Sequence, residues 1–185
     1  EIKQHATGEE LEKLQNLPEN RDKWFELING VIYEALMPSS MHSYIGLLIA
    51  AALLEFVIRH ELGFVFGDGC NYKLPNADEV IPDVSFIARG RGVPSFKAKL
   101  ELAPDLAVEV VSPGNRERAM LDKVESYLAS GTKLVWLVYP TIKVVDVYRL
   151  NNDGSINIRK ITVEGTLDGE DVLSGFTFPA SNIFP

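Results

Sequence analysis

Residues 104–139 read PDLAVEVVSPGNRERAMLDKVESYLASGTKLVWLVY, and this stretch decides the fold class. Residues 106–111 are apolar except for Glu109, which is typical of a strand covered on both faces. A Ser-Pro-Gly break follows, then a helical pattern from about residue 116 to 130, and then a second apolar run at 134–139. A strand, a helix and a strand in this order form a crossover unit, so the two strands are predicted to pair in parallel.

The segments on either side predict antiparallel strands around this unit. Asn29-Gly30 lies between two β-prone runs, which is a strong signal for a hairpin. Residues 64–74 are expected to form a strand that two glycines interrupt, and residues 80–87 another strand, with Pro82 near its start. Further strands are expected at 144–150 and 156–163. The resulting fold is α/β, with a mixed central β-sheet flanked by helices.

A long helix is predicted between Ser39 and Gly63, with Ser39 or Ser40 as its N-cap. Its middle is apolar around most of the circumference, which predicts a buried helix rather than an amphipathic one. The longest apolar run covers residues 45–54, whereas a membrane span needs roughly 20 residues. We therefore expect no association with a membrane.

The composition is that of one globular domain over residues 1–185, with residues 1–22 as a polar N-terminal arm or helix. Cys70 is the only cysteine, which excludes internal disulfides and zinc clusters. The net charge of −8 argues against a protein that coats nucleic acid through bulk charge, but it leaves room for a local basic surface. The charged N-terminus has no apolar signal core, so the cytoplasm is the simplest compartment.

Two carboxylates stand out because they interrupt apolar strands. Asp83 follows Ile81-Pro82, and Glu109 lies inside the apolar run at 106–111. A lone carboxylate in a buried strand is unfavourable unless it is paired or holds a metal. Lys123 borders the apolar stripe of the next helix and is close enough to that strand to approach it.

Each of these residues also has a structural interpretation. The carboxylates could belong to buried ion pairs, and Lys123 could extend its stem to solvent. His42 opens the long helix and either approaches a site or serves a structural purpose. Common nucleophile, phosphate-loop and zinc motifs are absent. Two carboxylates and a lysine taken together suit metal-assisted hydrolysis of a phosphodiester, with Mg²⁺ or Mn²⁺ on the oxygen ligands.

The sequence resembles the Uma2 family of endonucleases, which belongs to the PD-(D/E)XK restriction-endonuclease-like superfamily. The resemblance covers nearly the whole chain and rests on a set of short motifs. They are Phe25 to Gly30, Pro38-Ser39-Ser40 with His42, Ile81 to Val84, Pro104 to Pro113, Lys123 with Tyr127, Gly131, Trp136 to Pro140, and Gly175-Phe176.

The resemblance implies a restriction-endonuclease-like fold, with Asp83 and Glu109 as metal ligands. The superfamily pattern places a lysine two residues after the glutamate, but this position is Val111 here. In this family the lysine is displaced to the next helix, which makes Lys123 the catalytic candidate. Glu26, from the hairpin, is a further candidate in the same site.

A nuclease also has to hold a polyanion, and basic residues follow the strand at 80–87. The loop between this strand and the Glu109 strand carries four of them, and two more open the next helix. We expect a phosphate-contacting rim made of Arg89, Arg91, Lys97, Lys99, Arg116 and Arg118. The alternative is a solvated loop with no ligand.

The sequence thus predicts a metal-dependent DNA endonuclease. A homodimer is compatible with this function, because two-fold symmetry places one site on each strand of a duplex. Two alternatives remain open. One is a non-catalytic module on the same fold that binds nucleic acid or a partner, and the other is a nuclease that acts on RNA or on a mobile-element intermediate.

Overall fold

A computed structural model describes residue 2 and residues 5–35, 38–91, 99–112 and 117–185. Its centre is a six-stranded mixed sheet of order β10-β9-β8-β7-β6-β3. The strands of this sheet are β3 (Gly63–Phe66), β6 (Val84–Ala88), β7 (Leu106–Val110), β8 (Leu134–Tyr139), β9 (Val144–Leu150) and β10 (Ile156–Thr162). Strands β7 and β8 pair in parallel, as predicted, and the remaining pairs are antiparallel.

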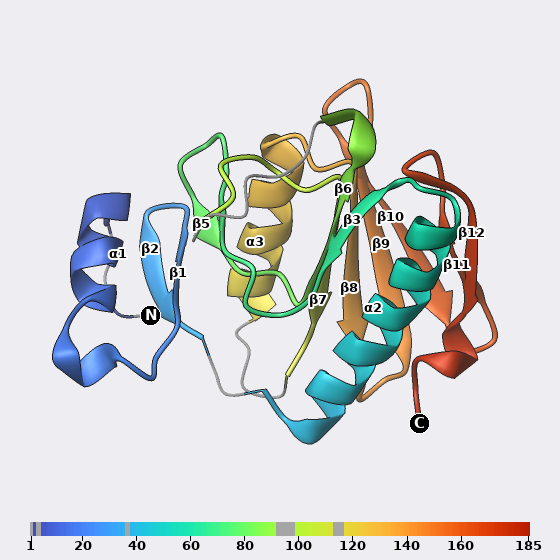
Figure 1. Cartoon of the computed structure of the whole chain (residues 1–185), viewed down its shortest axis with the longest axis horizontal. Helices are drawn as coiled ribbons and strands as arrows, with labels where there is room; N and C mark the ends of the chain where they lie inside the picture. Colours follow the sequence, from blue (N-terminus) through green and yellow to red (C-terminus); the bar gives the residue numbers. More distant parts are fainter. Residues whose placement is uncertain (1, 3–4, 36–37, 92–98, 113–116) are drawn as a thin grey trace.

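Two layers cover the faces of this sheet (Figure 1). One face carries helix α2 (Ser40–Arg59) and the hairpin of β11 (Thr166–Gly169) and β12 (Leu173–Pro179). The other face carries helix α3 (Glu117–Ala129) and a small sheet of order β2-β1-β5-β4. The strands of the small sheet are β1 (Phe25–Ile28), β2 (Val31–Glu34), β4 (Tyr72–Lys73) and β5 (Glu79–Val80).

The remaining elements are short. Helix α1 (Gly8–Gln15) packs on β1 within the region predicted to be an N-terminal arm or helix. In the described part of the chain, short 3₁₀ turns lie at η1 (Pro18–Asn20), η2 (Arg89–Arg91) and η3 (Ala180–Asn182). The Thr7 hydroxyl accepts a hydrogen bond from the Glu10 amide and caps α1, and the Thr7 amide donates to the Glu10 carboxylate, so both ends of this capping box are satisfied.

The hairpin at Asn29-Gly30 is confirmed. Both residues have positive φ angles, 49° and 71°, which a two-residue primed turn requires. Strands β1 and β2 pair from Phe25↔Glu34 to Ile28↔Val31. The pair lies in the small sheet, however, and adds nothing to the central one.

Two strand predictions were wrong in the same way. Residues 64–74 and 80–87 each divide between the two sheets, as β3 with β4 and as β5 with β6. Pro82 lies between β5 and β6, where the chain passes from the small sheet to the central one. No strand pairing there requires the N–H that proline lacks. The crossing leaves Asp83 immediately before β6, at the junction of the two sheets.

Helix α2 is buried along one stripe only, which corrects the prediction of a buried rather than an amphipathic helix. Ile45, Ile49, Leu53 and Val57 face the core, whereas Leu47 on the opposite side is 67% exposed. Within the described ranges α2 is the one helix long and apolar enough to cross a bilayer. Its buried stripe nevertheless forms part of the central core.

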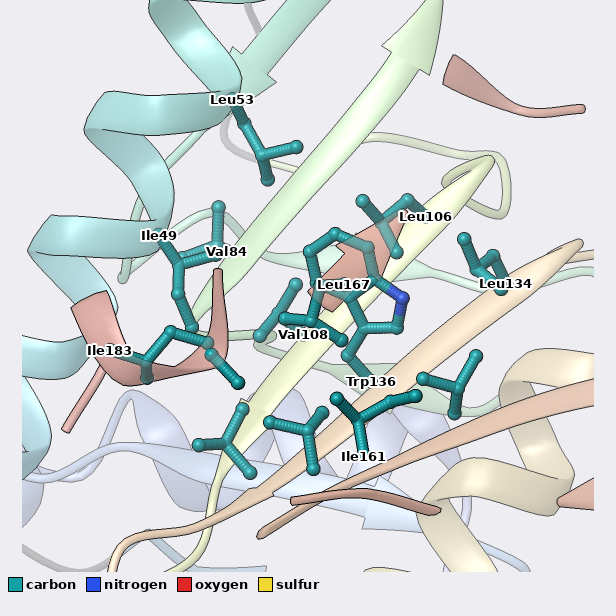
Figure 2. Packing of buried hydrophobic residues seen from close by; sticks show 14 of the residues in the cluster. Ile49, Leu53, Val84, Leu106, Val108, Leu134, Trp136, Ile161, Leu167 and Ile183 are labelled. Carbon is teal, nitrogen blue, oxygen red and sulfur yellow. The ribbon is translucent and has the colours of Figure 1, made fainter. Parts of the chain in front are cut away.

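That core centres on Trp136 in β8, which is fully buried (Figure 2). Alternation along β7 sends Val108 toward α2 and Ala107 toward α3, so Glu109 is directed at the α3 layer. Leu167 and Ile183, from the chain's last 20 residues, pack in the same core on the face of the sheet that α2 covers (Figure 2). The sequence analysis did not predict the β11–β12 hairpin that carries Leu167.

Candidate active site

The structure brings together the four residues that the sequence singled out for catalysis. Glu26 comes from β1, Asp83 from the residue just before β6, Glu109 from β7 and Lys123 from α3. All four line one cavity of about 430 Å³. The antiparallel register pairs Val84 with Val108, which places Asp83 across from Glu109.

Lys123 connects two of the three carboxylates. Its Nζ lies 2.6 Å from Glu26 Oε1 and 2.9 Å from each carboxylate oxygen of Glu109, and it donates to the Ile81 carbonyl at 3.0 Å. The residue is 2% exposed. The alternative of a lysine that extends to solvent is therefore wrong, because the ammonium is buried between two acidic groups.

The Glu109 carboxylate accepts hydrogen bonds from two α3 residues. Besides Lys123, the Tyr127 hydroxyl donates to Glu109 Oε1 at 2.8 Å. Lys123 and Tyr127 are one helical turn apart, so both side chains leave α3 on the face that meets β7. Tyr127 appeared in the sequence only as part of a motif, and its contact with Glu109 was not predicted.

Burial governs the protonation of this group. It raises the pKa of Glu109 to about 8, against the opposing charge of Lys123. Burial alone would lower the pKa of Lys123, but Glu109, Glu26 and Asp83 hold it above its usual value, so the lysine stays charged. Burial and the adjacent carboxylates raise the pKa of Tyr127, which remains a neutral donor.

Asp83 has a separate set of partners. Its Oδ2 accepts a hydrogen bond from the Val110 amide at 2.6 Å, and its Oδ1 lies 2.8 Å from His42 Nε2. The other ring nitrogen of His42 lies 2.8 Å from Ser112 Oγ. Burial would lower the pKa of His42, but the hydrogen bond and charge of Asp83 raise it above its usual value.

The helix cap explains why His42 reaches Asp83. Ser39 Oγ accepts from the His42 amide at 3.2 Å and fixes the first turn of α2. The imidazole therefore enters the cavity beside Asp83. Of the two interpretations of His42 left open by the sequence, the structure favours a residue at the site.

A buried aspartate holds β1 against α3. Asp78 Oδ1 accepts from the Asn29 amide at 3.0 Å, and Asp78 Oδ2 accepts from the Ser126 hydroxyl. The hairpin turn and the helix are thereby tied to one side chain. This connection keeps Glu26 within reach of Lys123.

The cavity is strongly acidic. Two lysines, Lys23 and Lys123, line it against six carboxylates. These carboxylates are Asp22, Glu26, Glu34, Asp68, Asp83 and Glu109. A phosphodiester would meet repulsion here unless a cation entered with it.

Among the described residues, no group of three or more His, Cys, Asp or Glu side chains is arranged to hold a metal ion. Lys123 lies between Glu26 and Glu109 and explains why these carboxylates do not form such a group. The donors of Asp83 and Glu109 still suit Mg²⁺, which proteins commonly hold through one or two carboxylates, with water and substrate phosphate completing the shell.

None of the described basic residues of the predicted rim lines this cavity, and their contact with phosphate stays a prediction. Asp83 precedes β6 and Arg89 follows it, six residues further along the chain, so the two lie roughly 20 Å apart at ~3.3 Å per residue. Arg91 lies 3.6 Å from Asp105, and Lys99 lies 2.6 Å from Glu79.

Arg118 differs from the other described basic residues of the predicted rim. It lies in the first turn of α3, on the helix that sends Lys123 into the cavity. Its side chain is 92% exposed, and its Nε lies 3.9 Å from Asp122 Oδ2. Lys97 and Arg116 lie outside the described residues. Lys23 lines the cavity but was missed, because nothing in its local sequence indicates that the predicted hairpin packs beside Asp83 and Glu109.

The mixed sheet, with carboxylates on adjoining strands and a lysine from the crossover helix, is a restriction-endonuclease-like arrangement. A sequence model of the Uma2 family, described as "Putative restriction endonuclease", matches residues 9–181. The chain therefore belongs to the Uma2 family, which confirms the resemblance seen in the sequence.

A solved structure has the same fold. It is a protein from Anabaena variabilis described as a "putative nuclease belonging to DUF820", with 21% identity and a TM-score of 0.80. The match covers 94% of this chain and 96% of the other. No curated protein matches the sequence.

Proposed function

We propose that this protein is a metal-dependent endonuclease that hydrolyses phosphodiester bonds in DNA. The observation that carries the proposal is the buried Lys123, which bridges Glu26 and Glu109 beside Asp83 on one cavity. Membership of the Uma2 family supports a nuclease, and the excess of acid in the cavity supports a divalent cation as cofactor.

In this proposal Asp83 and Glu109 hold Mg²⁺ or Mn²⁺. The metal supplies charge for the phosphate and lowers the pKa of a bound water. His42 and the Val110 amide fix the orientation of Asp83, and Tyr127 fixes that of Glu109. Lys123 remains protonated and provides a fixed positive charge for the phosphoryl oxygens in the transition state.

A cleavage assay tests the proposal. Plasmid, linear duplex and single-stranded DNA are incubated with the protein in Mg²⁺, in Mn²⁺ or in EDTA. Products are expected with a divalent cation and not with EDTA. Cleavage in EDTA would contradict metal dependence, and no cleavage of any DNA with any divalent metal would favour the non-catalytic module. The same assay with an RNA substrate determines whether the protein cleaves DNA, RNA or both.

Arg118 is expected to contact phosphate in this proposal. Arg118→Gln should reduce the slope of log K for DNA binding against log salt concentration by about one, because one counterion fewer is released. Fluorescence anisotropy at several salt concentrations measures the slope.

Arg89→Gln is the matched control for this prediction. It removes the same charge at the far end of β6, so the slope should stay as in wild type. Equal changes in both variants would show that DNA also contacts the η2 end. An effect of Arg89→Gln alone would assign the contact to the loop that the sequence predicted.

A further inference from the structure

Trp24 has more than half of its surface in water. It is 55% exposed, whereas Trp136, the other tryptophan of the chain, is fully buried. Trp24 lines the same cavity as Glu26, Asp83 and Lys123. An indole is the largest apolar group a protein can bury, so leaving it exposed beside reactive groups loses considerable stabilisation.

The backbone holds this indole in place. The Ala35 amide donates to the Trp24 carbonyl at 2.8 Å, which extends the β1–β2 pairing one residue beyond Phe25↔Glu34. Trp24 and Glu26 are two residues apart on this paired segment, so their side chains leave on the same face. Glu26 reaches Lys123 from this face, and the indole therefore lies on the cavity side.

The reactive groups lie in a recess. Glu109 is 4% exposed and Lys123 is even less exposed. The volume of about 430 Å³ falls in the range of pockets that enclose small ligands. A nucleotide released from its pair can enter such a recess, whereas a paired base stays in the helix.

Apolar groups accompany Trp24 in this cavity. Pro38 and Met120 also line it, so a base would meet an aromatic face and aliphatic neighbours while its phosphate approached the carboxylates. Stacking on an aromatic side chain is tolerant of base identity, because every base has a π-face.

We propose that Trp24 stacks on an unpaired nucleobase next to the scissile phosphate, and that the substrate is single-stranded at this position. The proposal rests on the proposed nuclease function and specifies its substrate class. Single strands, flaps and bulges offer such a base, and a fully paired duplex does not.

Tryptophan fluorescence tests the stacking directly. The protein is titrated with a single-stranded oligothymidylate of about ten nucleotides in Ca²⁺, which binds oxygen ligands and provides the cation that the acidic cavity needs. The emission of exposed Trp24 should be quenched, while buried Trp136 gives a constant background. Trp24→Phe should abolish the quenching and thereby assign the signal.

Affinities of variants for a labelled oligothymidylate, from anisotropy, separate stacking from general binding. Trp24→Leu should weaken single-strand binding by about 5- to 150-fold, the loss expected for one stacked base, whereas Trp24→Phe should retain most of the affinity. Tyr44→Leu is the matched control, because Tyr44 is also exposed but does not line the cavity. A blunt duplex should bind at least about tenfold more weakly and be insensitive to Trp24→Leu.

Binding without quenching, equal affinity of the Leu and Phe variants, or no single-strand binding would each overturn the stacking proposal. Cleavage that is independent of Trp24 would leave the nuclease function in place and remove only this inference. Quenching and Trp24-dependent affinity without cleavage in any divalent metal would leave the stacking in place and remove the catalytic function. Thermal unfolding of each variant confirms that it is folded.

Discussion

Replacing Lys123 by methionine should lower the free energy of unfolding by about 3–5 kcal/mol at pH 8, the usual loss when one partner of a buried ion pair is removed. Methionine keeps a long unbranched side chain and a good helix propensity, so the variant removes mainly the charge. Glu26 and Glu109 would then be buried without a countercharge. Urea denaturation followed by circular dichroism measures the change.

The loss should be nearly constant below about pH 8 and grow as the pH rises above it. Burial raises the pKa of Glu109 to about 8 even beside Lys123, and without this charge less opposes the effect of burial, so the pKa is higher still in the variant. A carboxyl with a raised pKa binds its proton more tightly in the folded protein than in the unfolded chain. Below about pH 8 Glu109 is protonated in both folded proteins and destabilises both equally, whereas above it only folded wild type ionises Glu109, so the difference between the two proteins increases.

Lys160→Met is the control for this prediction. Lys160 lies 3.4 Å from Asp146, and its side chain is 60% exposed, so its loss should lower the free energy of unfolding by no more than about 1 kcal/mol. Cleavage by Lys123→Met should fall by about 10²-fold or more, the scale of one preorganised electrostatic group. A Lys123→Met protein as stable and as active as wild type would contradict both assigned roles.

Local sequence patterns predicted the part of the site that the crossover unit carries. Glu109 interrupts an apolar strand, and Lys123 and Tyr127 occupy one side of the helix that must return over that strand. These residues meet because β7, α3 and β8 are consecutive. The same logic predicted the Asn29-Gly30 hairpin, since its turn is encoded by two adjacent residues with positive φ angles.

The other features of the fold and the site depend on pairing between residues that are far apart in the sequence. The division of residues 80–87 between two sheets depends on β5 meeting β1 and β6 meeting β7, and no window of sequence contains these partners. For the same reason, the sequence could not show that Trp24 enters the cavity. Helix α2 was predicted to be buried from its composition, but only its contacts with the sheet reveal which face is covered.

The cation beside Glu109 comes from α3 and not from position 111. Val111 follows β7 and packs, partly buried, against the core on the α3 side. The ammonium group of Lys123, on α3, contacts both Glu109 and Glu26. Glu26 thus takes part in the site by holding Lys123, a role that a motif search centred on β7 does not reveal.

Asp83→Asn should weaken Mn²⁺ binding at least about tenfold and lower cleavage by about 10²-fold or more, because a neutral amide is a poor ligand for a hard cation. Calorimetry measures the binding. Asp68→Asn is the matched control, since it removes one carboxylate from an exposed position of the same cavity. The charge of Asp68 helps to raise the pKa of His42, but among the described residues no hydrogen bond joins Asp68 to His42, Asp83 or Lys123. Its effect on Mn²⁺ affinity should be small.

The fold should tolerate Asp83→Asn, which makes the test selective for the site. The amide oxygen can still accept from the Val110 amide, and the NH₂ group can donate to His42 Nε2 if the ring proton moves to Nδ1 and is donated to Ser112. Nitrogen-15 NMR of the imidazole should report this change of tautomer, and stability should change by no more than about 1 kcal/mol. Mn²⁺ affinity equal to wild type in a folded Asp83→Asn protein would remove Asp83 from the metal site.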